Sequence, residues 1–446
     1  MEDSPPVTLH PVLVEKLNVA LEAAPLGPRT RRDASLPKIP GKVHAVIGMR
    51  RAGKTTFLRQ LQSDRRKTSA PEQAPYLSFD DDRLAGIGVE QLGYLLEEYY
   101  RRYPGLRGTR TVHWFLDEIQ LVPAWERFAR RVLDTEKIEL VVSGSSARML
   151  SKEVHTSLRG RGAPTVIRPF SFREFLRHRG EEPSRPPRRW TPAERSRIEH
   201  YFREYLSVGG FPEAQGLSET FRVELMQGYV DTVLFRDVVE RHGVTQVAAL
   251  RWLLRQCLRN PAGAFSVHRL HQDLKSQGHG VAKDAVHAML GHLEDAFLLC
   301  AMPMATESER QRNSNPRKIY PADPGLVPAF DRSGRSQAGH ALETVVFIEL
   351  DRQGAETGYL RTASGFEVDF LARHPGAEME LIQVCADPAE DGTWSREVRA
   401  LEEAGLSHPR ARRRVLVMDR DAAAAQAPRG IEVQPAYEWL LEKQPG

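Results

Sequence analysis

A short segment rich in glycine and basic residues constrains the fold of this chain more than any other feature. Residues 48–55 read Gly-Met-Arg-Arg-Ala-Gly-Lys-Thr and directly follow the largely apolar run 43–47. This is the phosphate-binding pattern G-x-x-x-x-G-K-[ST], which occurs between a strand and a helix. Residues 56–61 have helical spacing, so strand, loop and helix follow one another in the required order. The segment predicts an α/β fold with a phosphate-binding loop after its first strand.

Each residue type in this loop has a physical reason. Gly48 and Gly53 allow the backbone to curl so that successive N–H groups point at one phosphate group. Lys54 would reach the β- and γ-phosphates, and the Thr55 hydroxyl would hold Mg²⁺. The other residues expected at the nucleotide in this segment are Arg51, Ala52 and Thr56. The alternative is a glycine-containing turn that matches the pattern by chance.

The composition is that of a soluble globular protein with several domains. A chain of 446 residues is too long for one core, which predicts about two to four domains. No apolar stretch is long enough to cross a bilayer, and the N-terminus lacks the pattern of a signal peptide. Three widely spaced cysteines argue against a disulfide framework and for a reducing cytoplasm. The net charge of +4 is too small to establish a DNA-binding protein.

Strand-like runs alternate with helical patterns after the loop. These runs lie at 76–79, 112–116, 138–142 and 165–167. Strands that alternate with helices predict right-handed crossovers and a doubly wound parallel sheet. Such a sheet binds its ligand at the carboxyl ends of its strands, which is where the phosphate-binding loop is expected.

Two carboxylates follow the second of these runs. Asp117 and Glu118 come directly after the apolar residues 112–116. An acid at this strand end can bind the Mg²⁺ shell, and the next acid can polarise a water for attack on the γ-phosphate. The alternative is an acidic helix N-terminus, since Asp and Glu also suit the helix dipole. Together with the upstream loop, the pair predicts catalysis by Glu118 and metal binding by Thr55 and Asp117.

Hydroxyl and guanidinium groups farther along the chain are further catalytic candidates. Ser143 and Ser145 follow the strand expected next to the loop strand, so a hydroxyl there can contact the γ-phosphate; the alternative is a helix cap. Arg159 and Arg161 are candidates for an arginine finger, supplied in cis or from a neighbouring subunit. In a chain so rich in arginine, a solvated surface loop is the alternative for either residue.

The order of the motifs resembles a family of prokaryotic AAA-like ATPases that ends in a domain of unknown function. The resemblance covers roughly residues 40–440 and implies an AAA-related ATPase fold with strand order 5-1-4-3-2. It also implies that Pro212, in a G-x-P element, contacts the nucleotide base from a helical lid; a helix-ending turn is the alternative. The motifs that carry the resemblance are the phosphate loop, L-D-E-I-Q, S-G-S-S-A, L-R-G-R, P-F-S-F-R-E-F, Gly209 to Glu213, Phe235 to Val238, Lys318 to Tyr320, Asp323 to Gly325, Gly339-His340, Leu342-Glu343 and Glu367 to Phe370.

The middle of the chain fits a winged-helix plan. Residues 264–300 predict one helix, a turn at 276–280 and a longer second helix. The exposed face expected on the second helix carries Lys283, Asp284, His287, His292 and Glu294, a mixed set rather than the Arg, Lys, Asn and Gln of a DNA reader. Packing within the protein and DNA binding are both open for this region.

The C-terminal region resembles a restriction-endonuclease-like core that lacks its lysine. Glu343, Asp369 and Gln383 occupy the acid and glutamine positions, but Cys385 stands where the lysine of the pattern is expected. A thiol supplies no fixed positive charge, which predicts an inactive domain used for binding or assembly. The alternative is that Glu343 caps or pairs locally and Asp369 ends a strand. Lys318 is remote in sequence and could move in among these acids, but nothing in the sequence supports this.

The expected organisation has five regions. They are an N-terminal segment (1–40), a P-loop AAA-like domain (41–180), a helical lid (193–243), a winged-helix-like domain (244–325) and a C-terminal α/β nuclease-like domain (335–446). The leading hypothesis is a cytoplasmic, Mg²⁺-dependent ATPase whose nucleotide state repositions the later domains. The alternatives are a slowly hydrolysing regulatory or defence switch and a DNA-binding ATPase. ATP and ADP, DNA, a protein partner and a second copy of the chain are the candidate partners.

Overall fold

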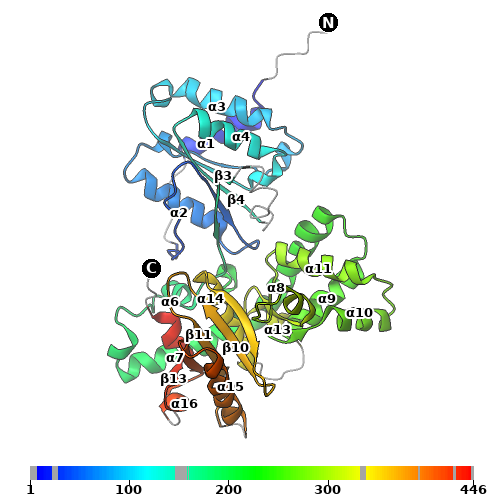
Figure 1. The fold of residues 1–446 in the computed structure, drawn as a ribbon. Coiled ribbons are helices and arrows are strands. Elements are labelled where there is room, and N and C mark those ends of the chain that lie inside the picture. Colours follow the sequence, from blue (N-terminus) through cyan, green and yellow to red (C-terminus); the bar gives the residue numbers. More distant parts are fainter. Residues whose placement is uncertain are drawn as a thin grey trace. The chain divides into compact units, whose positions relative to one another are not determined.

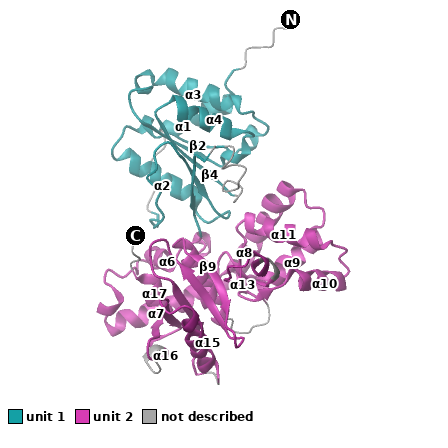
Figure 2. Ribbon diagram, viewed as in Figure 1, with its two compact units in different colours: residues 1–168 teal, residues 169–446 magenta. Residues whose placement is uncertain are grey.

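The computed structural model describes residues 8–22, 29–145, 158, 160–331, 338–389, 392–424 and 428–442. The chain divides into two compact units, Met1–Arg168 and Pro169–Gly446 (Figure 2). In the described residues, no helix has both the length and the apolar character needed to cross a membrane.

The first unit is built on a five-stranded, wholly parallel sheet in the order β2-β3-β4-β1-β5 (Figure 1). Read from the other edge, this is the order 5-1-4-3-2, so that expectation is confirmed. The strands are β1 (Val43–Ile47), β2 (Tyr76–Ser78), β3 (Val112–Asp117), β4 (Ile138–Gly144) and β5 (Gly162–Val166). All four strand-like runs predicted after the loop correspond to strands.

Helices cover this sheet and bury most residues of its inner strands. The helices are α1 (Pro11–Glu22), α2 (Lys54–Arg66), α3 (Glu90–Arg102) and α4 (Trp125–Thr135). Every residue of β1 is buried, as expected for a parallel strand with both faces covered. The core under α2 joins Phe57 and Leu58 to Val46, Phe115 and Val141. This packing holds the start of α2 at the carboxyl end of β1.

The second unit contains a mixed five-stranded sheet in the order β13-β12-β11-β10-β9. β9, β10 and β11 pair antiparallel, whereas β11, β12 and β13 pair parallel. The strands are β9 (Glu356–Arg361), β10 (Glu367–Arg373), β11 (Glu380–Cys385), β12 (Arg412–Val417) and β13 (Glu432–Pro435). This sheet is the mixed α/β part of the fold that the sequence predicts for the C-terminal region.

Two hydrophobic cores lie on the two faces of this mixed sheet. One core joins it to α6 (Phe172–Arg179), α7 (Pro192–Val208), α14 (Ala338–Arg352) and α17 (Ala436–Leu441). The other core joins it to α15 (Thr393–Ser407), and the short helix α16 (Arg420–Ala424) follows β12. The sheet is therefore a layer between helices, and its buried strands can carry polar side chains out of contact with solvent.

A helical region with a small sheet completes the second unit (Figure 1). The small sheet is antiparallel, with the order β6-β8-β7. The elements are α8 (Glu219–Val233), a π-helical segment (Leu234–Glu240), α9 (Val247–Arg259), β6 (Ala264–Phe265), α10 (Val267–Ser276), α11 (Lys283–Asp295), β7 (Leu299–Met302), α12 (Glu309–Ser314), β8 (Arg317–Pro321) and α13 (Leu326–Phe330). The two helices predicted within 264–300 correspond to α10 and α11.

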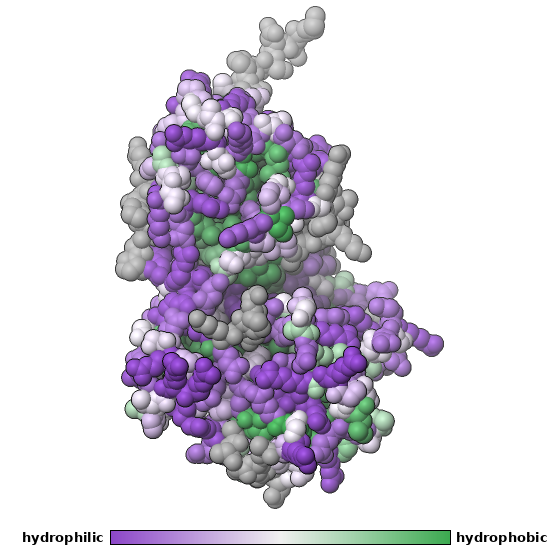
Figure 3. Space-filling view, turned by 60° about the vertical axis from the view of Figure 1, so that its left-hand side comes forward, coloured by the Kyte–Doolittle hydropathy of each residue, from purple (hydrophilic) through white to green (hydrophobic). Residues whose placement is uncertain are grey.

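Hydrophilic residues dominate the face of the molecule in Figure 3, with smaller apolar areas between them. The large exposed hydrophobic side chains are dispersed along the chain: Val19, Ile39, Tyr94, Leu121, Leu217, Phe221, Phe235 and Leu406. Single exposed apolar residues of this kind are normal for a folded surface.

Candidate functional site

The phosphate-binding pattern forms the turn between β1 and α2. Gly48 has φ 146° and lies so close to strand β5 that a Cβ there would overlap the carbonyl oxygen of Ile167. Arg51 and Gly53 are also in positive-φ conformations, with φ 66° and 101°. Left-handed residues in a short turn direct backbone N–H groups toward one point, which makes an anion-binding concavity. The backbone of this loop therefore has the shape that a phosphate group needs.

Arg32 supports the loop from outside the pattern. Its Nη1 donates a hydrogen bond to the carbonyl oxygen of Ala52 at 2.8 Å, and its Nη2 donates to the carbonyl oxygen of Arg168. Arg32 is buried, and its guanidinium lies directly beside Gly53. No local sequence pattern indicates this residue, because its partners Ala52 and Arg168 lie 20 and 136 residues farther along the chain.

Lys54 is the first residue of α2 and is buried. Its Nζ donates to the carbonyl oxygens of Gly48 at 3.0 Å and Met49 at 3.1 Å, so the ammonium lies over the loop that it would share with a phosphate group. Neutral carbonyls are weaker partners for an ammonium than charged phosphate oxygens. The side chain is therefore held close to its expected position by contacts that a phosphate can replace.

Asp117 is the meeting point of three hydroxyl groups. Thr55 Oγ1 donates to Asp117 Oδ2 at 2.8 Å, and the hydroxyls of Ser143 and Tyr76 also contact this carboxylate. Parallel pairing of β3 with β2 and β4 brings these strand ends to one edge of the sheet. The structure thus brings together Thr55, Asp117 and Ser143, which the sequence predicted for metal and phosphate binding. Asp117 is buried, with 2% of its surface exposed.

Tyr76 and Arg59 are members of this site that the sequence did not indicate. The Arg59 guanidinium lies 3.3 Å from the centre of the Tyr76 ring, which is a close cation–π contact. Burial, with the adjacent Asp117 carboxylate, raises the pKa of Tyr76, so its hydroxyl keeps its proton and donates to that carboxylate. The only available signal was that Tyr76 begins a predicted strand.

Glu118 adopts a left-handed conformation with φ 55° directly after β3. Its backbone N–H donates to Ser143 Oγ at 3.0 Å, and its carboxylate accepts a hydrogen bond from Gln120. A non-glycine residue at positive φ is strained, and such strain is often found at functional positions. The turn separates the two neighbouring acids, leaving Glu118 partly exposed while Asp117 is buried.

Two further candidates lie in the first unit. Ser145 is buried just after β4, and Thr56 Oγ1 lies 3.3 Å from Arg29 Nη1 at the start of α2. Ser145 follows β4 and Thr56 follows the phosphate-binding loop, so both lie at the edge of the sheet where this loop lies.

The arginine candidates do not lie at the loop. Arg161 precedes β5, and its carbonyl oxygen accepts from the N–H of Val43, at the start of β1. Because β1 and β5 are parallel, this is the opposite end of the strands from Gly48, roughly 20 Å away along the strand. Arg161 also pairs with Asp134. The structure therefore does not support a role in cis; a role in trans stays a prediction. Arg159 lies outside the described residues.

Pro212 belongs to the second unit and begins a short 3₁₀ helix, Pro212–Ala214. The turn before it is built tightly, because the N–H of Gly210 donates to Asp323 Oδ2 at 2.7 Å and a Cβ on Gly210 would overlap the carbonyl of Phe170. Burial raises the pKa of Asp323 to about 7, although the N–H groups of Gly210 and Gly325 favour its charged form. Contact between Pro212 and a nucleotide base stays a prediction.

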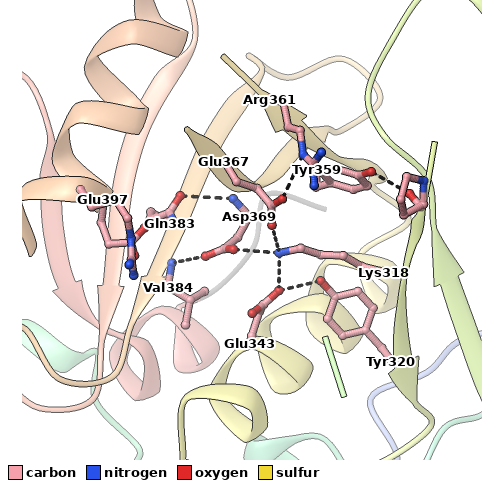
Figure 4. Close-up of polar contacts among 12 residues, drawn as sticks. Lys318, Tyr320, Glu343, Tyr359, Arg361, Glu367, Asp369, Gln383, Val384 and Glu397 are labelled. Atoms are coloured by element: carbon pink, nitrogen blue, oxygen red, sulfur yellow. Dashed lines mark hydrogen bonds and ion pairs between the residues drawn. The ribbon is translucent and has the colours of Figure 1, made fainter. Parts of the chain in front are cut away.

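A second polar site lies inside the second unit, and Figure 4 shows it. We call it the lysine–carboxylate cluster: Lys318 and Tyr320 from β8, Glu343 from α14, and Glu367 and Asp369 from β10. Lys318 Nζ lies 2.9 Å from a carboxylate oxygen of each of the three acids. Glu343 and Asp369, predicted to share a site, therefore do meet. No sequence pattern supported the entry of Lys318 among these acids, yet β8 brings it to them from outside the C-terminal sheet.

The predicted lysine position of this region holds Cys385 at the end of β11. Burial raises the pKa of the Cys385 thiol to about 12, so the group is neutral and cannot replace an ammonium. Gln383, two residues earlier, accepts from the N–H of Asp369 at 3.2 Å and contacts Glu397. Gln383 thus orients the cluster without touching Lys318.

The parallel sheet, the loop after β1 and the acid pair after β3 define an AAA-like P-loop domain. A family model described as an AAA domain matches residues 40–176, and a model of a domain of unknown function (DUF8612) matches residues 199–337. A domain of unknown function thus follows the AAA domain in this chain, and the nuclease-like outline of the C-terminal region stays a prediction.

Relatives extend over nearly the whole chain. The uncharacterized protein MJ1544 of Methanocaldococcus jannaschii is 31% identical over 402 residues, which cover 89% of this chain and 86% of MJ1544. An uncharacterized protein of Haemophilus influenzae is 24% identical, covering 90% of this chain and 94% of that protein. The chain belongs to the same family as MJ1544.

Two solved structures align with most of this chain at low sequence identity. The Walker-type ATPase PABY2304 of Pyrococcus abyssi is 14% identical and aligns over 73% of this chain and 99% of its own, with a TM-score of 0.42. The Aeropyrum pernix ORC1 protein, solved in complex with DNA, is 16% identical and aligns over 72% and 91%, with a TM-score of 0.30.

Proposed function

We propose that the protein is a Mg²⁺-dependent ATPase of the AAA-related class. The hydrogen bond from Thr55 to Asp117 carries this proposal, because it joins the hydroxyl after the loop lysine to the acid at the end of β3. These two groups, the loop backbone and the ammonium of Lys54 fit a nucleoside triphosphate with its metal ion. The close approach of Gly48 to Ile167 supports the same fit, since it requires a residue without a side chain at the first position of the loop.

Each residue has a defined task in this proposal. The loop N–H groups and Lys54 bind the β- and γ-phosphates, and Thr55 and Asp117 hold Mg²⁺, which neutralises phosphate charge. Glu118 accepts the proton of the attacking water, as a carboxylate partly open to solvent can. Ser143 and Ser145 donate to the γ-phosphate. The further proposed contacts are Arg51, Ala52, Gly53 and Thr56 at the phosphates, Arg161 from a neighbouring copy and Pro212 at the base.

Steady-state ATP hydrolysis tests the catalytic assignment. Lys54→Ala and Glu118→Gln are expected to lower turnover to background, because one removes phosphate binding and the other removes the proton acceptor. Lys67→Ala and Glu90→Gln are the matched controls, since both residues are exposed in the first unit. Equal rates in the wild type and in both site variants would rule out the assignment.

A slowly hydrolysing nucleotide-gated switch is the second candidate. It is favoured by the engagement of both acids, since Asp117 accepts from three hydroxyls and Glu118 from Gln120. Catalysis would first have to displace these contacts. Nucleotide that co-purifies with negligible turnover supports the switch, whereas many cycles per minute support the enzyme.

Residues 244–325 support a winged-helix role within this proposal. Helix α9, strand β6, helices α10 and α11, and strands β7 and β8 follow in the winged-helix order, with sheet order β6-β8-β7. On α11, Lys283, Asp284 and His287 are exposed, whereas Glu294 accepts from the N–H of Ala301 at 3.0 Å. This mixed surface favours a region that packs within the protein and whose position changes with the nucleotide state. DNA affinity that falls steeply with added salt would favour DNA binding instead.

A further inference from the structure

The ammonium of Lys318 is surrounded by three carboxylates. Nζ donates hydrogen bonds to Glu343 Oε1 and Asp369 Oδ1 at 2.9 Å and forms an ion pair with Glu367 Oε1, also at 2.9 Å (Figure 4). Only 5% of the side chain is exposed. An ammonium that is buried and held by three carboxylates is poorly placed to orient a water molecule. Lys318 is therefore not placed as the water-activating lysine of a nuclease.

The carboxylates are themselves oriented toward one point. Tyr320 donates its hydroxyl proton to Glu343 Oε1 at 2.8 Å, and the N–H of Val384 donates to Asp369 Oδ2 at 3.0 Å. Asp369 Oδ1 and Glu343 Oε1, the oxygen that also accepts from Tyr320, are the two oxygens that accept hydrogen bonds from Nζ. Convergent carboxylate oxygens from separate elements are the ligands that Mg²⁺ and Mn²⁺ prefer. Here the position between them holds an ammonium.

Strand pairing fixes Lys318 from the other side. β8 is the central strand of the small sheet, and Lys318 pairs with Ala264 of β6 and Met302 of β7. The backbone of Lys318 thus pairs within the small sheet, while its ammonium contacts the carboxylates of α14 and β10. The side chain joins two parts of the second unit and cannot leave the acids without movement of β8.

We propose that Lys318 is a built-in cation that occupies a divalent-metal position between Glu343 and Asp369. It excludes Mg²⁺ and Mn²⁺ from the C-terminal sheet and fastens β8 to that sheet. Removal of the ammonium would convert the three acids into a metal site. This role is independent of ATP hydrolysis, and it explains why a nuclease-like set of acids remains in a domain whose lysine position holds Cys385.

The electrostatics of the cluster agree with this assignment. Burial alone would lower the pKa of Lys318, but Asp369, Glu343 and Glu367 raise it above its ordinary value, so the ammonium stays charged. Burial and the neighbouring Asp369 raise the pKa of Glu343 to about 8. A divalent ion carries two positive charges and would favour the charged form of Glu343 more strongly than the single charge of Lys318.

Mn²⁺ binding to the full-length protein without nucleotide tests the proposal. Electron paramagnetic resonance counts the bound Mn²⁺ ions, and the ions that are lost when Glu343 is replaced in Glu343→Gln are assigned to the cluster. In the wild type, Glu343→Gln is expected to remove no bound Mn²⁺. Lys318→Met, which keeps the length of the side chain without its charge, is expected to gain about one Mn²⁺ that Glu343→Gln removes again. Lys275→Met, at an exposed lysine of α10, is the matched control.

Thermal unfolding gives a second readout. Lys318→Met is expected to lower Tm by roughly 5 to 10 °C without metal, because buried carboxylates lose their partner, and Mn²⁺ is expected to restore part of the loss. Wild-type Mn²⁺ binding that Glu343→Gln abolishes would overturn the proposal, and this comparison needs no Lys318 variant. A folded Lys318→Met protein that gains no Glu343-dependent Mn²⁺ would overturn it as well.

Discussion

Two buried lysines show how differently one side chain serves the two units. Lys54 bonds to the carbonyl oxygens of Gly48 and Met49, both within a few residues of it. Lys318 bonds to Glu343, Glu367 and Asp369, which come from two other elements. The carbonyl oxygens that Lys54 contacts are weaker partners for an ammonium than phosphate oxygens, whereas three carboxylates surround Lys318. The first arrangement is suited to binding a ligand and the second to holding the fold.

The same substitution at both lysines, Lys54→Met and Lys318→Met, tests this comparison most directly. Lys54→Met is expected to weaken ATP binding roughly 10²-fold while changing Tm little, because a ligand partner is lost. Lys318→Met is expected to lower Tm while leaving ATP binding near wild type. Isothermal titration with ATP and Mg²⁺, together with thermal unfolding, measures both. Loss of ATP binding in both variants, at equal Tm, would contradict the division of roles.

A comparison of Gly48 with Gly41 tests why the loop needs a glycine at its first position. Gly48→Ala is expected to cost about 3 kcal/mol or more, since its Cβ would overlap the Ile167 carbonyl and its φ is 146°. Gly41→Ala is the control, because Gly41 also has positive φ, at 69°, but meets nothing within 4 Å. Urea unfolding and ATP titration measure the difference. Equal costs at the two positions would show that backbone conformation alone, and not close approach, sets the requirement.

The stability of the second unit is expected to fall as pH rises through the pKa of Asp323. Burial raises the pKa of Asp323 to about 7, above its unfolded value, so the stability it contributes is present at low pH and is lost as pH rises through about 7. Asp323→Asn removes this titration. Relative to the wild type, the variant is expected to gain about 2 to 3 kcal/mol between pH 5 and pH 8. Parallel profiles of Tm against pH would contradict the raised pKa.

The smallest expected effect concerns the hydroxyl of Tyr76. Tyr76→Phe removes one donor to Asp117 but keeps the ring under Arg59, so stability is expected to fall by about 1 kcal/mol. Because Asp117 is then less firmly oriented, the concentration of Mg²⁺ needed for half-maximal ATP hydrolysis is expected to rise. Tyr94→Phe, at an exposed tyrosine of α3, is the control. No change in the Mg²⁺ requirement would remove Tyr76 from the site.

The same two regions show what a sequence can predict. The phosphate loop is contiguous, so its residue types alone indicated its place after β1, and each predicted strand was confirmed by the sheet. The cluster depends on β8 meeting α14 and β10, and no local pattern places Lys318 among those acids. Glu343 and Asp369 were predicted together only through a resemblance of motifs. The places of Tyr76 and Arg32 at the site were not predicted, because their partners are distant in sequence.

The most direct test of the account compares binding with turnover in one variant. Glu118→Gln removes the proposed proton acceptor but leaves Gly48, Lys54, Thr55 and Asp117 in place. The account predicts that Glu118→Gln binds ATP and Mg²⁺ with near wild-type affinity while steady-state hydrolysis falls at least about 10²-fold. Hydrolysis at the wild-type rate by a Glu118→Gln protein that binds ATP normally would contradict the central claim.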